Sequence, residues 1–248
     1  MLKSGRLWGM FPLWAKELRM NPDPDVVVWP DYQEFYRWLR QEIAGLTDAQ
    51  LDFDSQDPEQ EWMWWSIRRQ VSHIACLSLV FPYRRCHAFL WPGGNIPAPI
   101  RWEDHVPMAA SKFDRRLDPT LYWDLETLLE KTKLGVEWVT RASTTVPVET
   151  IRATESVHTA TPFWRHVIQV IPRGVWIDDQ DANRIHYTLE ASFWMLYWEV
   201  MVHLYTIQRL KRAQGLPIKV TIPLVGYLSL PEYTGETEHP APPQVRVR

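Results

Sequence analysis

The chain has 248 residues, of which 46% are hydrophobic and 23% are charged, and it carries a net charge of -3. These values are those of a globular protein, and the basic residues are dispersed rather than gathered in the patch that nucleic-acid binders show. No uncharged run approaches the ~18–20 residues that cross a bilayer, so we expect neither nucleic acid nor a membrane as a partner.

Cysteine and the N-terminal segment bear on where the protein works. Cys76 and Cys86 are the only cysteines, too few for a disulfide framework, and we expect both to be reduced and buried in a cytoplasmic protein. The segment 1–20 is basic and apolar, but Lys16 and Glu17 interrupt it and no small-residue cleavage site follows, so we expect no signal peptide. The 15 tryptophans predict many buried contacts, within one chain or between chains.

Hydrophobic residues recur at spacings of three and four in four stretches, which predicts four helices. Their ranges are 31–46, 61–82, 119–143 and 187–213. The first opens with Asp31 and Glu34 in capping-box spacing, and the second ends near Pro82, which a helix interior does not accommodate without strain. The third is predicted to start with Asp118 as its cap and Pro119 at its first position.

The insert 145–185 is mixed in character. Its segments TVPVETI (145–151) and HVIQVI (166–171) are rich in β-branched residues, and we expect short strands or irregular loop there rather than a second domain. The tail 216–248 is rich in proline, and we expect it to pack along the surface as extended chain.

The predicted fold is therefore mainly α, a single domain over residues 1–248 built as a four-helix bundle with long inserts. The long connections do not force each helix to run antiparallel to the next. The helical pattern alone leaves up-down-up-down and up-down-down-up both open.

A candidate site lies in the fourth helix, in SFWMLYWEVMVHLYTIQRLKRAQG (192–215), which is apolar on almost every side but carries Glu199 and His203. Residues four apart share a helix face, and an uncompensated carboxylate in a core costs several kcal/mol. A divalent cation would remove that penalty. His73 is the only histidine on another strongly helical segment, so we predict His73, Glu199 and His203 as metal ligands that leave positions free for water or substrate.

Spacing alone also permits a structural alternative. Glu199 and His203 can simply hydrogen-bond each other, and a pair is a weaker signal than a three-ligand motif. Each can also pair with an arginine, and the candidates are Arg68, Arg69 and Arg209.

Other polar groups carry weaker signals. His166 could fold over the site from the insert. Arg84 and Arg85 suit an anionic substrate or, alternatively, the dipole at the end of a helix. The acidic segment 178–181 predicts a solvated turn, because a calcium loop needs more oxygen ligands at set spacing.

Three segments together resemble the DinB/YfiT-like superfamily of small metal-binding four-helix bundles. They are LTDAQLDF (46–53), WMWWSIRRQVSHIA (62–75) and EVMVHLYTIQRLKRAQGLP (199–217). In that family a histidine late in WS(I/V)…H(I/L) on the second helix joins two from an HxxxH motif on the last helix. His73 and His203 fall on the first and last of these positions, and Glu199 stands where the first histidine of HxxxH is usual.

The resemblance implies an up-down-down-up bundle that binds a divalent metal ion, with zinc, nickel, iron and manganese as candidates. Characterised relatives include thiol-dependent transferases and isomerases that use low-molecular-weight thiols, and some hydrolases. We therefore expect a metal-dependent transferase or hydrolase whose substrate is a small molecule, with a low-molecular-weight thiol among the candidates. The alternative is a non-catalytic binding or interaction module with a degenerate or empty metal site.

The half of the fourth helix opposite Glu199 is apolar as well, although a bundle helix has only one core-facing stripe. Its residues are Trp194, Tyr197, Trp198, Met201, Leu204 and Tyr205. We expect a homodimer contact to cover this half, with the insert and the tail as the alternative covers.

Overall fold

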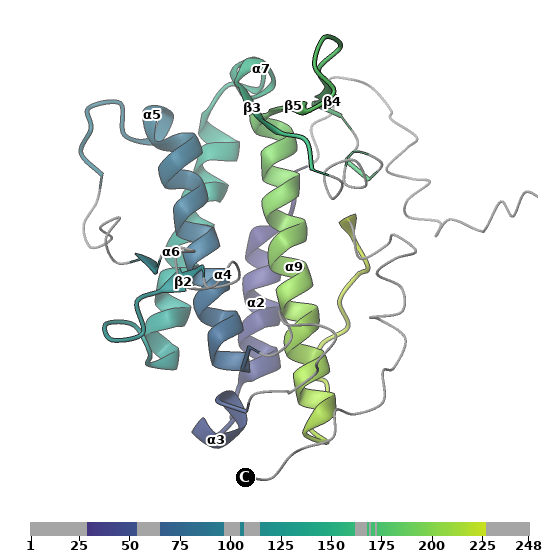
Figure 1. The fold of residues 1–248 in the computed structure, drawn as a ribbon. Helices are drawn as coiled ribbons and strands as arrows, with labels where there is room; N and C mark the ends of the chain where they lie inside the picture. The colour runs from purple at the N-terminus through teal and green to yellow at the C-terminus, as the bar shows by residue number, and fades with distance from the viewer. Residues whose placement is uncertain are drawn as a thin grey trace, which may run out of the picture.

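The computed structural model describes residues 29–53, 65–96, 105–106, 115–161, 168, 170–171 and 173–226. Four long helices form the bundle that the sequence predicts (Figure 1): α2 (Tyr32–Ile43), α4 (Ile67–Phe81), α6 (Leu125–Thr145) and α9 (Leu189–Ala213). None of the helices in these ranges is long and apolar enough to cross a bilayer. The described helices share one hydrophobic core, and a single domain over the whole chain stays a prediction.

Contacts at the helix ends show that α2 and α9 run in the same direction. The hydroxyl of Tyr32, at the start of α2, donates to the carbonyl of Phe193, near the start of α9. At the other end, Glu42 pairs with Lys211. Phe81, at the end of α4, packs against Phe193 with ring centroids 5.6 Å apart, so α4 is antiparallel to α9.

Helix α6 runs parallel to α4. The Arg68 guanidinium at the start of α4 donates to the carbonyl of Trp123, just before α6, over 3.0 Å. Further along both helices, a Cβ on Gly135 would lie 2.5 Å from the carbonyl oxygen of Ser78, so only glycine permits this close approach. Helices α2 and α9 therefore run one way and α4 and α6 the other, which is the expected up-down-down-up order (Figure 1).

The start of α6 was predicted wrongly. Its N-cap is Asp124, whose carboxylate accepts from the N–H of Thr127 over 2.9 Å. Asp118 instead accepts from the N–H of Thr120 over 2.8 Å and closes a local turn. Both aspartates are good caps, and an Asp side chain that bonds two residues ahead competes with helix formation.

Helix α4 begins at Ile67, after its N-cap Ser66, which is later than the predicted residue 61. It ends at Phe81, next to the predicted Pro82, but the chain stays helical beyond the proline. A π-helical turn, η2 (Pro82–Cys86), and the short helix α5 (His87–Leu90) follow. Pro82 takes the first position of the new turn, where a missing N–H is tolerated. A second short helix, α3 (Asp48–Leu51), lies between α2 and α4.

The insert contains a three-stranded antiparallel sheet, which confirms the expected short strands. Its strands are β3 (Glu155–Thr159), β4 (Val175–Ile177) and β5 (Arg184–Thr188), in the order β3-β5-β4. The segment TVPVETI is not a strand, because most of it lies in helix α7 (Val148–Ala153), which begins after Pro147. Of HVIQVI, residues 166, 167 and 169 lie outside the described residues. Asp178 accepts from the N–H of Gln180 over 2.8 Å, which forms the predicted turn.

A second, two-stranded sheet pairs β1 (His105–Val106) with β2 (Arg116–Leu117). Leu117 is buried in the core cluster, so β2 is anchored on the bundle. This strand brings the neighbouring Arg115 to α4.

The tail from Leu216 runs without helix or strand beside α9 as far as Val225, as expected of extended chain. It covers part of the second apolar half of α9, because Gly226 lies against the indole of Trp198, which is 1% exposed. That half is buried within one chain and does not need a second copy. The homodimer stays a prediction.

Candidate metal centre

The three residues predicted from the sequence meet at one point between α4 and α9. One ligand atom each from His73, Glu199 and His203 lies within 4.8 Å of the other two. The imidazole centroids are 4.3 Å apart, and both histidines are buried. The side chain of Glu199 is 22% exposed, so the cluster is closed on the histidine side and open at the carboxylate.

Local sequence explains how the two helices present these groups. Ser66 caps α4 by accepting from the N–H of Arg69 over 3.3 Å, which fixes where the helix begins. His73 lies two turns later on its buried side. Just before the cap, the indole of Trp65 packs edge-on against His73 and stacks on His203, with centroids 5.1 and 6.5 Å away.

Each histidine is held through Nδ1. The Nδ1 of His203 lies 2.7 Å from the Oε1 of Gln70, and the Nδ1 of His73 bonds to the carbonyl of Arg115. Both partners are oxygen acceptors, so each Nδ1 donates a proton, and Nε2 is the ring nitrogen that each histidine has left for a metal ion. Metal-binding histidines characteristically donate their other N–H in this way.

The electrostatics favour the protonation states that metal binding needs. Burial, followed by the nearby His203, holds the pKa of His73 well below its ordinary value, so His73 is neutral at pH 7. Burial alone would raise the pKa of Glu199, but His203, together with His73 and Arg115, outweighs it and lowers the pKa to about 2. The cluster therefore offers a neutral imidazole and an ionised carboxylate.

Two of the three arginines that could have paired with Glu199 or His203 have partners elsewhere. Arg68 binds Asp48 and Asp52, with 2.7 Å from its Nε to Asp52, and Arg69 lies over the Trp65 ring at 5.9 Å. A direct Glu199–His203 contact remains, with 3.8 Å between Oε1 and Nε2. This distance permits attraction between charges but is too long for a hydrogen bond.

Of the other histidines, two make contacts away from the cluster and two fall outside the described residues. His166 and His239 are among residues whose placement is not described. His158 contacts Arg85, and His186 lies between the carboxylates of Glu155 in β3 and Asp178 in the turn after β4.

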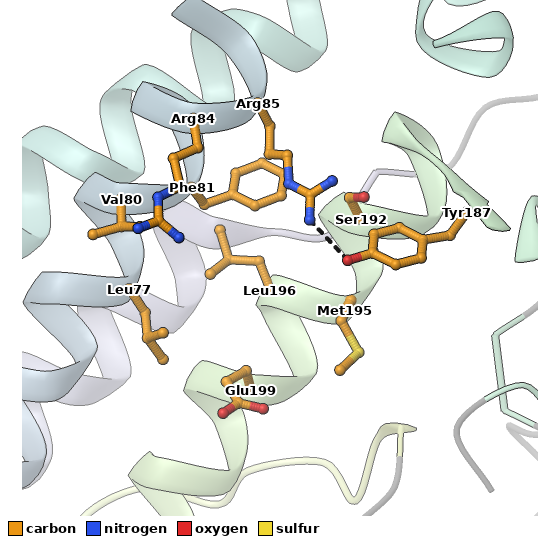
Figure 2. Close-up of a pocket in the computed structure, with 10 residues that line it drawn as sticks. All are labelled: Leu77, Val80, Phe81, Arg84, Arg85, Tyr187, Ser192, Met195, Leu196 and Glu199. Carbon is orange, nitrogen blue, oxygen red and sulfur yellow. Dashed lines mark hydrogen bonds between the residues drawn. The ribbon is translucent and has the colours of Figure 1, made fainter. Parts of the chain in front are cut away.

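A pocket of about 200 Å³ adjoins the cluster between α4 and α9, and Glu199 belongs to both. Figure 2 shows Glu199 at one end of this pocket, Arg84 and Arg85 at the other, and Leu196 between them. A small molecule in the pocket would therefore lie next to the carboxylate of the candidate metal centre.

Comparison with known proteins adds a likeness of overall structure. No family model matches the chain, and no curated protein matches its sequence. Among solved structures, the chain is similar to YfiT from Bacillus subtilis, described as a probable metal-dependent hydrolase with an unusual four-helix bundle topology. The identity is 17%, the match covers 79% of this chain and 95% of that chain, and the TM-score is 0.42. The candidate metal centre rests on the contacts given above.

Sequence reasoning missed the groups that orient the ligands. Gln70 was given no role, although its position on the buried side of α4, one turn before His73, was a usable signal. The carbonyl of Arg115 left no signal, because any residue type supplies a carbonyl and its placement depends on the path of the chain.

Proposed function

We propose that His73, Glu199 and His203 hold one divalent metal ion, and that the protein is a metal-dependent enzyme acting on a small molecule, by transfer or hydrolysis. The arrangement of the two histidines is the observation that carries this proposal. Their Nδ1 atoms are bound to Gln70 and to the carbonyl of Arg115, which leaves both Nε2 atoms as ligands.

The donor set supports catalysis more than a structural role. Structural zinc sites are closed by four protein ligands, whereas catalytic sites combine three with an open position. Among the residues that the structure describes there are three candidate ligands, and the carboxylate borders a pocket. A divalent ion at such a site supplies a Lewis acid that polarises a carbonyl or lowers the pKa of a bound water or thiol. Two imidazoles and one carboxylate suit zinc, and also iron, nickel and manganese.

A low-molecular-weight thiol is our first candidate co-substrate, on the basis of the motif resemblance. A Lewis acid would activate a bound thiol and a bound water alike, so the metal centre by itself favours neither a transferase nor a hydrolase.

Metal content is the direct test. The protein is made without a histidine tag, dialysed and analysed for transition metals, and we expect close to one ion per chain. Cobalt substitution provides a second readout, because its visible absorption bands report the coordination number. A protein that neither retains nor takes up a divalent ion at neutral pH would refute the proposal and support the non-catalytic module with a Glu199–His203 pair.

A further inference from the structure

The pocket beside the metal centre has opposite chemistry at its two ends. Two antiparallel helices form its long walls, and each contributes positions i, i+3, i+4 and i+7 of one stripe. They are Leu77, Val80, Phe81 and Arg84 on α4 and η2, and Ser192, Met195, Leu196 and Glu199 on α9. Seven residues of helix advance about 10 Å, so this distance separates Ser192 from Glu199 along α9. The middle of the pocket is apolar and its ends are polar.

Arg85 forms the end remote from the metal centre. One of its Nη2 hydrogen bonds reaches the Tyr187 hydroxyl over 2.8 Å and another the Nε2 of His158 over 2.9 Å, while Nη1 donates to the hydroxyl of Ser156. Its Cζ also lies 5.1 Å from the Tyr187 ring centroid. All these partners are neutral groups.

The charge of Arg85 therefore has no carboxylate to balance it among the residues that the structure describes. His158 accepts the hydrogen bond and is held neutral, because burial and then the charge of Arg85 lower its pKa. A guanidinium that is partly removed from water without a counter-ion is unfavourable. Three of its five N–H groups are used in these bonds, and guanidinium edges match carboxylate and phosphate oxygens.

Arg84 adds positive charge at the same end. Figure 2 shows its side chain near Val80, on the helix that carries Arg85. Two adjacent cations at one end of an apolar-walled pocket attract anions, and the low-dielectric walls strengthen this field. The opposite end carries the carboxylate of Glu199, which repels an anion unless a metal ion neutralises it.

We propose that this pocket binds a small molecule with a carboxylate or phosphate at the Arg85 end and an apolar body along Leu196 and Phe81, so that its far end lies beside Glu199. The orientation of the far end toward a metal ion rests on the proposed function, whereas anion recognition by Arg85 does not. The pocket therefore selects amphipathic anions about 10 Å long over neutral molecules of the same shape.

The first experiment uses metal-free protein, so that only the arginine end is tested. Octanoate, octyl phosphate and the neutral octanol are titrated by calorimetry or ligand-observed NMR. We expect at least one anion to bind about tenfold or more tightly than octanol, as hydrogen bonds to a charged group would give. Octanol binding as tightly as both anions would overturn the proposal without any variant.

Variants then assign the selectivity to Arg85. Arg85→Gln should remove the preference for the anion, Arg85→Lys should keep part of it, and Arg141→Gln, an exposed arginine of α6, should leave it unchanged. Circular dichroism and the melting temperature check that Arg85→Gln still folds. A folded Arg85→Gln variant that keeps the full preference would place the anion elsewhere and overturn the assignment.

A second experiment separates this inference from the proposed function. Zinc-loaded protein is titrated with suberic acid monohydroxamate, which has a carboxylate at one end and a metal-binding group at the other, and with octanohydroxamate, which lacks the carboxylate. Tighter binding of the first, lost in Arg85→Gln, supports both ideas. If the protein takes up no zinc but metal-free protein still prefers the anion, the pocket inference stands and the proposed function fails.

Discussion

Glu42 and Lys211 form an ion pair in which neither side chain has any exposed surface. The lysine also donates to the backbone carbonyl of Glu42 over 2.7 Å. The Glu42 carboxylate also accepts hydrogen bonds from the N–H groups of Lys219 and Val220 in the tail, at 3.1 to 3.3 Å, and from the side-chain amide of Gln208 at 3.0 Å. One buried carboxylate thus joins α2, α9 and the C-terminal tail.

Removing one member of this pair should be strongly destabilising, because the other charge would stay buried without a partner. We expect Lys211→Met to lower the free energy of unfolding by about 3–5 kcal/mol. Urea denaturation measures it. Lys133→Met is the matched control, since Lys133 pairs with Glu137 on the surface over 3.6 Å and its loss should cost less than about 1 kcal/mol. Equal effects of the two variants would contradict the buried pair.

Gln70 should act on metal binding through His203. Gln70→Leu removes the acceptor that fixes the His203 tautomer, and we expect metal affinity to fall about 10–100-fold. Gln70→Glu keeps an acceptor at the same place and should restore most of the affinity. Competition with a chromophoric chelator gives the affinities, and indistinguishable values for Gln70→Leu and Gln70→Glu would show that Gln70 only packs.

Glu199→Gln should weaken metal binding more than folding, because the amide keeps the volume of the side chain and removes its charge. Loss of a group that only hydrogen-bonds a ligand lowers metal affinity about 10–100-fold, and we expect the loss of the Glu199 ligand itself to lower it further. The unfolding midpoint of the metal-free protein should change little. Glu149→Gln, at an exposed position, is the control. Retention of metal as tightly as wild type would remove Glu199 from the ligand set.

His186 should titrate above its ordinary range. Its Nδ1 contacts Glu155 and its Nε2 lies 2.9 Å from Asp178, and the two carboxylates raise the pKa of His186 above its usual 6.5. The folded state therefore holds this proton more tightly than the unfolded state. The resulting stabilisation is complete below pH 6.5 and is lost as the pH rises through the folded-state pKa. The pKa of Asp178 falls to about 2, chiefly through His186, so on the acid side the pair is lost as the pH falls through this value.

Histidine NMR measures this titration directly. Asp178→Asn should move the His186 midpoint down, while Asp179→Asn, at the exposed neighbouring position, should leave it in place. A midpoint below 6.5 in the wild type would contradict the arrangement.

Gly226 should control the attachment of the tail. Its φ is 59°, and a Cβ there would lie 2.2 Å from the Trp198 ring. Gly226→Ala should therefore lift the tail from α9, with hydrogen exchange at the Lys219 and Val220 amides becoming faster. Gly215→Ala is a matched control, because Gly215 also has a positive φ, 68°, but no atom lies within 4 Å of its Cβ position. This variant therefore shows the cost of backbone strain alone, about 1–3 kcal/mol, without a steric clash. Unchanged exchange in Gly226→Ala would mean that Trp198 does not hold the tail.

Much of the bundle could be predicted because its signals are local. The stripes of α2 and α4 and the capping Asp31 depend on spacing alone, and so does the placement of Glu199 and His203 on one face. The start of α6 could not be predicted, because Asp118 and Asp124 are equivalent caps in sequence. The orienting groups were out of reach for a similar reason, since the Arg115 carbonyl acts on His73 from 42 positions away.

Parallel α4 and α6 have a cost and a use. Helix α4 ends at the opposite end of the bundle from the start of α6. The chain between Leu90 and Leu125 must therefore return along the length of α6, which is about 30 Å for its 21 residues. That return delivers β2 and the Arg115 carbonyl to His73. Sequence changes in the returning segment can thus retune one ligand while every bundle residue stays the same, which makes this connection the natural place for an engineer, or for evolution, to adjust metal affinity.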